Sequence, residues 1–330
     1  MTLGQATAWL VFLAAWLAGP PVAATPDYRL GASIQDGASL PVAAGLARLV
    51  SIGDRGFAVT EVAETDVAQT VAALAKGEIH FALVNGLAAF RAFAGAGDYG
   101  GRAVRELRAV SGLIPHAIHF LVHADQVRDA TLGDVGALSG TLNLGSRFGD
   151  GRRITTALLE AVGIDVGTLR IGFRSHPEAV KALSRRLVAA VNADGLVPVA
   201  AATQAFAIMG PSRVRLLAVS EAELERLDWR FPGVWFAQTI APGTYPGLNR
   251  PVRLPSLAQV IVARAEVPEN DVHALVAAIF ENLDGVRKIY PAAAGVSLAT
   301  ALRGLALLLH SGAARFYREQ GRPVPERLSP

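Results

Sequence analysis

Polar and charged side chains gather in the segment 141–164, TLNLGSRFGDGRRITTALLEAVGI, where a short apolar strand runs into a glycine-rich turn and then into a helical pattern. Such a turn presents backbone N–H groups at a helix N-terminus, where anions and polar ligands bind. The helix dipole disfavours cations in a first turn, so Arg152 and Arg153 indicate a nearby anion. We expect that anion to be a ligand, Asp150 or Asp194, and the default alternative is that one of the two arginines is simply exposed to solvent. Asp150 has the alternative role of a plain helix cap. The segment therefore predicts a polar binding site.

Three histidines, His116, His119 and His123, have the spacing of ligands on one face of a helix. The surrounding sequence AIHFLVHAD alternates like a strand, however, which places His119 and His123 on one face, two pleats apart. No Asp or Glu joins them at the spacing of a zinc site. We therefore predict no metal site.

The sequence also lacks the common catalytic and nucleotide-binding motifs. It contains 0 cysteines, which excludes disulfides, thiolate metal sites and cysteine nucleophiles. There is no Gly-x-Ser-x-Gly elbow, no His-Glu-x-x-His and no Walker A sequence. The glycine spacing of the segment 141–164 is the reverse of a dinucleotide fingerprint. We predict no cofactor and no enzymatic activity; the best enzymatic alternative is a phosphoribosyltransferase or pyrimidine-synthesis enzyme on a bilobed fold.

Composition favours a globular protein with two lobes. The chain has 330 residues, of which 52% are hydrophobic and 18% charged, enough to bury a large core. The formal net charge is only +3, and the 31 basic residues are scattered along the chain rather than gathered in a patch. A nucleic-acid-binding protein concentrates its basic residues, so we predict no nucleic-acid partner.

The N-terminus resembles a secretory signal. An apolar run over residues 6–18 ends at a Gly-Pro-Pro break, and the sequence Val-Ala-Ala up to Ala24 fits a cleavage site. The run is shorter than a transmembrane span. No Lys or Arg precedes it, so an uncleaved anchor or a buried first helix remains the alternative. We predict a signal peptide over residues 1–24, cleavage after Ala24 and a periplasmic protein.

Short strands and helices alternate from Asp27 onward, which is typical of parallel sheets covered by helices on both faces. Two apolar stretches, 107–113 and 117–125, lie back to back as strands and mark a crossing between lobes. Helices are expected at about 40–51, 67–77, 150–162, from 175, and at 199–208, 269–282, 297–309 and 312–319. The fold class predicted is α/β, with two parallel-rich sheets, a hinge and an interlobe cleft.

Several segments, in order, resemble the TAXI-type solute receptors of TRAP transporters. They are APGTYPG (241–247), VPENDVHALVAAIFENLDGVRK (267–288), LHSGAARFYREQG (309–321), LAKGEIHFALVN (74–85) and LIPHAIHFLVHAD (113–125). The last is similar to a Leu-Tyr-Pro-Glu-x-x-His strand of that family. The resemblance implies the type II periplasmic-binding-protein fold. Residues 26–114 and 234–330 would form lobe 1, and residues 115–233 lobe 2.

The resemblance also implies where a ligand binds. Gly149, Asp150 and Gly151 take the places of a Gly-Ser-Gly turn, and Arg152 that of a threonine. The family's ligand is a small organic acid or amino acid, but this chain departs from the family at several pocket motifs. The candidate ligand-binding residues are Ser33, Gln35, Asp66, Gln69 and Asn85 in lobe 1, and Ser146, Asp150, Arg152 and Asp194 in lobe 2.

Together these features predict a monomeric extracytoplasmic protein that captures a small polar or anionic solute by lobe closure. Its partners would be the solute and the membrane subunits of a TRAP transporter. A periplasmic sensor domain that signals to a kinase is the main alternative, because it would share every pocket feature.

Overall fold

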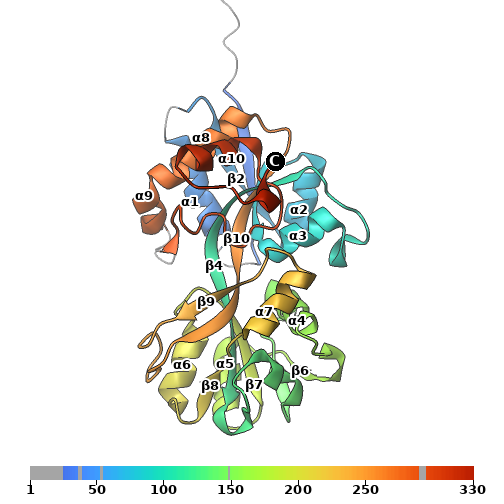
Figure 1. Ribbon diagram of the computed structural model, residues 1–330, viewed down its shortest axis with the longest axis vertical. Helices are drawn as coiled ribbons and strands as arrows, with labels where there is room; N and C mark the ends of the chain where they lie inside the picture. The colour runs from blue at the N-terminus through green and yellow to red at the C-terminus, as the bar shows by residue number, and fades with distance from the viewer. Residues whose placement is uncertain (1–24, 36–38, 53–54, 148, 290–294) are drawn as a thin grey trace, which may run out of the picture.

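Two lobes, stacked along the long axis of the molecule, are visible in the computed structural model (Figure 1). The structure describes residues 25–35, 39–52, 55–147, 149–289 and 295–330, so the predicted signal peptide over 1–24 lies outside the described residues. Within those described ranges, none of the helices has the length and apolar character needed to span a bilayer.

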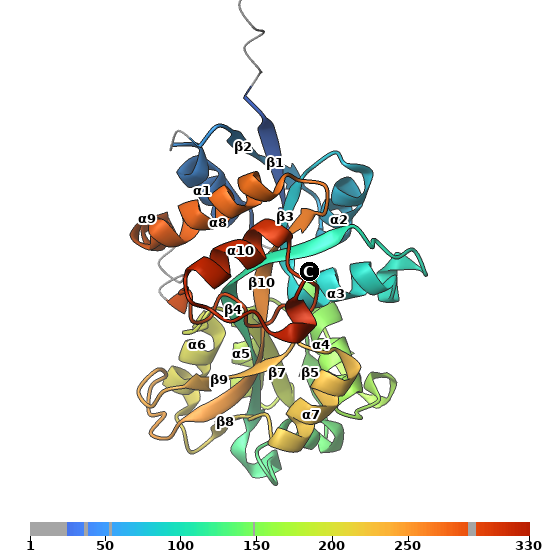
Figure 2. The same cartoon turned by 45° about the horizontal axis from the view of Figure 1, so that its top comes forward.

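The first lobe is built around three parallel strands. Its elements are β1 (Asp27–Ser33), α1 (Ser39–Ser51), β2 (Ala58–Glu64), α2 (Val67–Lys76), β3 (Phe81–Asn85) and α3 (Gly86–Ala94), followed later in the chain by α8 (Glu269–Glu281), α9 (Leu283–Ile289) and α10 (Ser311–Glu319). Strand β1 pairs in parallel with both β2 and β3. The helices α8 and α10 pack against each other and cover one side of this lobe (Figure 2).

The second lobe repeats this α/β pattern. Its elements are β5 (Thr141–Asn143), α4 (Asp150–Ala161), β6 (Arg170–Gly172), α5 (His176–Ser184), β7 (Ala190–Gly195), α6 (Ala200–Met209), β8 (Val214–Leu216), α7 (Glu221–Arg230) and β9 (Phe236–Ile240). Strand β5 lies between β6 and β7, parallel to both. Short 3-10 turns lie at Gly97–Tyr99, Ala124–Gln126, Leu132–Ala137, Val166–Thr168 and Glu326–Leu328.

Two long antiparallel strands, β4 (Leu107–His123) and β10 (Val252–Arg264), pass through both lobes (Figure 1). They join the strands into a single sheet of order β2-β1-β3-β10-β4-β7-β5-β6, with β8 on β4 and β9 on β10. The sequence suggested two strands, at 107–113 and 117–125, but β4 is continuous. The crossing is a change of partner: β4 pairs with β10 as far as Ala117 and with β7 from Ala117 onward.

The predicted helix at 297–309 is wrong, because this segment forms turns. Its carbonyl groups bond to β4 instead of to their own helix. The N–H of Gly112 donates to the carbonyl of Ala301 at 2.7 Å, and that of Ala109 to Leu308 at 2.9 Å. Helices α3, α7 and α9 were not predicted. The other predicted helices form, within a few residues of their expected ends.

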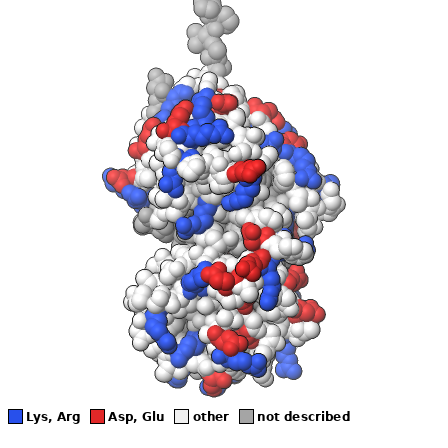
Figure 3. All heavy atoms as spheres, viewed as in Figure 1, with Lys and Arg blue, Asp and Glu red and all other residues white. Residues whose placement is uncertain are grey.

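The chain returns to lobe 1 later than the sequence suggested. Strand β9 pairs with the first half of β10, and Ile240, Tyr245 and Leu254 are buried in the core that α5, α6 and β7 form in lobe 2. The expected boundary at residue 234 therefore separates β9 from the core against which it packs. On the face shown in Figure 3, basic and acidic residues are interspersed over both lobes, and the molecule is narrower where the two lobes meet.

Candidate functional site

A cavity of about 280 Å³ lies between the two lobes. Its polar lining comprises Gln35 and Asn85 from lobe 1, His116 and Gln259 from the two crossing strands, and Ser146, Asp150, Arg152, His176 and Asp194 from lobe 2. Asn85 and Asp194 lie at or next to the carboxyl ends of β3 and β7. The turn from β5 to α4 supplies Ser146, and the first turn of α4 supplies Arg152. Ligands of open α/β sheets bind at this end of the strands.

Six of the nine residues proposed from the sequence line this one cavity: Gln35, Asn85, Ser146, Asp150, Arg152 and Asp194. The other three lie outside its lining. Ser33 is buried at the end of β1. Asp66 is the N-cap of α2 and accepts a hydrogen bond from the backbone N–H of Gln69 at 2.8 Å, while Gln69 itself is exposed. Asp66 therefore caps helix α2 and does not line the cavity.

The turn that begins α4 is shaped by glycines that allow close approach. Gly145 has a φ of 73°, and a Cβ there would lie 3.2 Å from Nε2 of His176. A Cβ on Gly151 would lie only 2.7 Å from Oδ1 of Asp194. Gly149 is the N-cap and offers no side-chain hydrogen bond to the first turn. The start of α4 is therefore a tight turn, and the backbone N–H groups of its first turn donate no hydrogen bond to the side chain of a cap residue.

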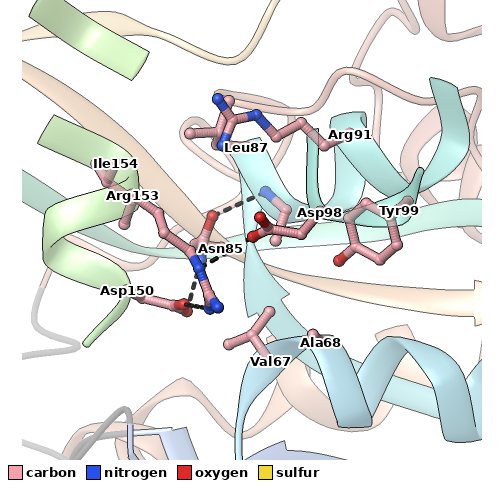
Figure 4. Close-up of a pocket in the computed structure, with 11 residues that line it drawn as sticks. Val67, Ala68, Asn85, Leu87, Arg91, Asp98, Tyr99, Asp150, Arg153 and Ile154 are labelled. Carbon is pink, nitrogen blue, oxygen red and sulfur yellow. Dashed lines mark hydrogen bonds and ion pairs between the residues drawn. The ribbon is translucent and has the colours of Figure 1, made fainter. Parts of the chain in front are cut away.

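The two arginines in the first turn of α4 have different surroundings. Arg153 contacts Asp98 of lobe 1, Nε to Oδ2, at 2.9 Å and Asp150 at 3.2 Å (Figure 4). Arg152 is exposed at the cavity and forms no ion pair with any described residue. For Arg153, the nearby anion that the sequence indicated is therefore a carboxylate of the protein itself. Arg152 has no such partner among the described residues, so its guanidinium can pair with a ligand anion.

A second contact bridges the lobes beside Arg153. Nδ2 of Asn85 donates to Oδ2 of Asp150 at 3.2 Å, and Oδ1 of Asn85 caps α3 by accepting from the N–H of Ala88 at 2.9 Å. These residues line a narrow pocket of about 30 Å³ next to the larger cavity (Figure 4). Tyr99 lies at its edge, where burial and the nearby carboxylates of Asp150 and Asp98 raise the pKa of its hydroxyl group.

His119, one of the three histidines of β4, has a structural role. His119 is fully buried: its Nδ1 donates to the carbonyl of Ala117 at 3.0 Å, and its Nε2 accepts from the hydroxyl of Tyr245 at 2.7 Å. That hydroxyl also accepts from the N–H of Val199 at 3.1 Å. Burial lowers the pKa of His119 to about 4, so the ring is neutral and structural. Among the described residues, no group of three His, Asp or Glu side chains could hold a metal ion.

Sequence reasoning missed His116, His176 and Gln259 as cavity residues. Gln259 faces the cavity because β10 runs antiparallel beside β4, a pairing with no local sequence signal. The available signal for His116 was strand alternation, which places it on the opposite face of β4 from His119. His176 is the first residue of α5. The capping box of Ser175 and Glu178 starts the helix at this point and so places His176 at the cavity.

Residues 30–321 match the NMT1-like family. The chain belongs to the NMT1-like family. Among solved structures, it is similar to XAC2383 of Xanthomonas citri with bound chloride, at 12% identity over 89% of this chain and 95% of that one, with a TM-score of 0.50. It is also similar to the periplasmic aliphatic sulphonate binding protein SsuA of Escherichia coli, at 13% identity over 92% and 88% of the two chains, with a TM-score of 0.45.

A third similar structure is the binding protein component of an ABC phosphonate transporter from Pseudomonas aeruginosa, at 12% identity over 81% and 79% of the two chains, with a TM-score of 0.43. Identities this low speak to fold alone. This NMT1-like chain has the bilobed α/β architecture of type II periplasmic binding proteins, as the resemblance implied. The expectation of two parallel-rich sheets is wrong, because the long strands β4 and β10 join the strands of both lobes into one mixed sheet.

Proposed function

We propose that this protein is a TAXI-type receptor that captures a small polar or anionic solute, of the amino acid or carboxylate class, for a TRAP-type secondary transporter. It would be exported, cleaved after Ala24 and active in the periplasm as a monomer. Closure of the two lobes over the solute would create the form that the membrane subunits recognise.

The observation that carries this proposal is the interlobe cavity, since both lobes and both crossing strands contribute polar side chains to it. A solute held there contacts both lobes at once and so favours the closed arrangement. Within the part of the chain that the structure describes, the two strands β4 and β10 run through both lobes, which suits a hinge.

The charges at the cavity support the ligand class. Arg152 and Asp194 line it with opposite charges, and neither forms an ion pair with another described residue. A ligand carboxylate suits the guanidinium fork of Arg152 beside the first turn of α4. The ammonium group of an amino acid would suit Asp194.

The experiment is ligand binding to protein purified without refolding. Native mass spectrometry should reveal a co-purified solute, and a panel of carboxylates and amino acids should include at least one that raises the melting temperature. A solute that is converted to product at this cavity would instead favour an enzyme. The genes beside this one distinguish the partner: a fused TRAP membrane subunit supports transport, and a kinase supports a sensor.

Arg152→Gln tests the ligand contact itself. Because the guanidinium makes no ion pair among the described residues, the melting temperature of the ligand-free protein should barely change. Affinity should fall by about 1.5–3 kcal/mol, the cost of losing a hydrogen bond to a charged group. Arg170→Gln, on an exposed arginine of the same lobe outside the cavity lining, is the matched control. Unchanged affinity with lost stability would make Arg152 structural.

A further inference from the structure

A second cavity, of about 700 Å³, lies in lobe 2 and shares no lining residue with the interlobe cavity. It forms where β8, the loop from β9 to β10 and the start of β10 meet (Figure 1). Its volume lies within the range of pockets that hold small organic ligands, about 300–1,000 Å³. The cavity therefore has room for a ligand of its own, to which the proposed function assigns no role.

The wall that the loop from β9 to β10 forms is held in place at several points. Tyr245 of this loop is fully buried. Gly247 packs closely on Pro211, because a Cβ at this glycine would lie 2.8 Å from Cγ of the proline ring. The N–H of Val219 donates to the carbonyl of Arg253 at 2.8 Å. The cavity is therefore preformed, and ordering its wall costs a ligand little free energy.

The lining of this second cavity is positively charged. Its charged side chains are those of Arg215, Arg250, Arg253 and Asp129. Arg253 pairs with Glu221, which lies outside the lining. Arg215 and Arg250 are exposed, and neither forms an ion pair with any described residue. Two guanidinium groups can therefore reach and pair with a ligand anion.

Apolar side chains lie in the same lining as these guanidinium groups. Leu248 and Val252 are partly buried, and Pro211 and Pro251 are exposed, so all four have carbon surface that a ligand can cover. Covering apolar surface contributes about 25 cal/mol per Å². A small hydrated anion would leave this surface in water, and a neutral apolar molecule would leave the guanidinium groups without a partner. The lining thus favours an anion that has an apolar body.

We propose that this second cavity binds a small amphipathic anion, an organic acid whose carboxylate pairs with Arg215 and Arg250 while its apolar body covers Leu248 and Val252. A guanidinium group matches a carboxylate with two parallel hydrogen bonds. Asp129 repels an anion bound in the same cavity, so its removal has the opposite effect to removal of the arginines. The inference goes beyond the proposed function, because the solute site between the lobes uses none of these residues.

Isothermal titration calorimetry with three probes tests the inference: phenylacetate, phenethylamine and acetate. Phenethylamine keeps the apolar body but reverses the charge, and acetate keeps the carboxylate but lacks the ring. The wild-type protein should bind phenylacetate about tenfold or more tightly than either of the others. The double variant Arg215→Gln/Arg250→Gln should weaken phenylacetate binding about tenfold or more. Asp129→Asn should strengthen it about two- to fivefold.

Arg170→Gln is the matched control, because Arg170 is an exposed arginine of lobe 2 outside the lining of both cavities. It should bind phenylacetate like the wild type, and melting curves should show every variant folded. Three results overturn the inference: a wild type that binds none of the probes, one that binds phenethylamine or acetate as tightly as phenylacetate, or an affinity for phenylacetate that the double variant leaves unchanged.

The Arg152→Gln variant separates the two cavities. Its affinity for phenylacetate should equal that of the wild type, since Arg152 does not line the second cavity. Loss of phenylacetate binding in this variant would place the probe between the lobes and would also overturn the inference. The proposed function is decided separately, by the co-purified solute, whose affinity the double variant of Arg215 and Arg250 should leave unchanged.

Discussion

At the scale of single residues, neighbours of the same type differ in what they contact. Arg152 and Arg153 both lie in the first turn of α4, and only the resemblance to the receptor family separated them by selecting Arg152 as a ligand contact. The separation depends on Asp98, which another lobe brings to Arg153. His116 and His119 differ in the same way: Tyr245 satisfies His119, and the cavity lies beside His116. The residue types were predictable, but their partners depend on contacts distant in sequence.

Burial of His119 leads to a prediction about stability and pH. The pKa of His119 is about 4 in the folded protein, below the ordinary value of 6.5, so the unfolded chain takes up this proton first as the pH falls. The free energy of unfolding therefore keeps the full contribution of the neutral ring above pH 6.5. It decreases by about 3 kcal/mol as the pH falls from 6.5 to 4. Burial also lowers the pKa of His123 and His310, which adds to the trend.

Urea unfolding measured from pH 7.5 to 4.5 checks this prediction. His119→Gln should lower stability at pH 7.5, because the ring's fitted contacts with Tyr245 and Ala117 are lost. The variant should also show a weaker dependence on pH than the wild type. Equal slopes in the two proteins would mean that other groups control the loss of stability in acid.

At the scale of elements, the first turn of α4 leads to a prediction about capping. Gly149 has a φ of −78° and a ψ of 159°, which any residue can adopt, and a Cβ there would lie 3.4 Å from Cβ of Ser146, an ordinary contact. Gly149→Asp should therefore cap the helix and raise stability by a few tenths of a kcal/mol. The new carboxylate would occupy the amides and repel an anion, so affinity for an acidic ligand should fall several-fold.

Gly149→Ala is the control for that substitution, because it adds a Cβ without a cap. Thermal melts and titration with the same acidic ligand should show little change in its affinity. If Gly149→Asp and Gly149→Ala bind the ligand equally well, the first-turn amides of α4 do not contribute to binding.

The elements that sequence predicted share strong local signals. Helix α2 has a capping Asp66 and a terminal Gly77 with a φ of 76°, and its limits were predicted closely. The segment 297–309 has a helical pattern, but bonding of its carbonyls to β4 overrides local propensity. Two strands were expected where β4 is one, because its continuity comes from pairing with β10 and β7. Local signals predict elements, whereas sheet partners decide how they connect.

At the scale of the whole molecule, two kinds of contact join the lobes. One is apolar and lies where the chain leaves α7: Phe231 packs edge-on against Phe90 of α3, with ring centroids 5.8 Å apart, and Val234 lies close to Gly86. The other is polar, and includes the contacts of Arg153 with Asp98 and of Asn85 with Asp150. The polar contacts border the cavity, so they form part of what opening of the lobes would break.

Asp98→Asn tests whether the polar contact holds the lobes closed. The side chains of Arg153 and Asp98 are 41% and 53% exposed, so their ion pair is worth about 0.2–1 kcal/mol. Its loss should shift the equilibrium between open and closed lobes by at most about fivefold. Small-angle scattering should give a larger radius of gyration for the ligand-free variant and an unchanged one with ligand bound. Affinity should fall by less than that factor, because it follows the fraction of closed molecules rather than the ratio of closed to open ones. Raising the salt concentration should reduce the difference between variant and wild type.

The matched control for this last prediction is Asp284→Asn, which removes a carboxylate paired with Arg287 at 2.9 Å within one helix of lobe 1. Because that pair does not connect the lobes, neither the radius of gyration nor the affinity should change. If Asp98→Asn behaves like this control, the ion pair with Arg153 only neutralises charge at the start of α4. Closure would then depend on the ligand and on the apolar contact of Phe231 with Phe90, and the two crossing strands would set the resting angle of the lobes.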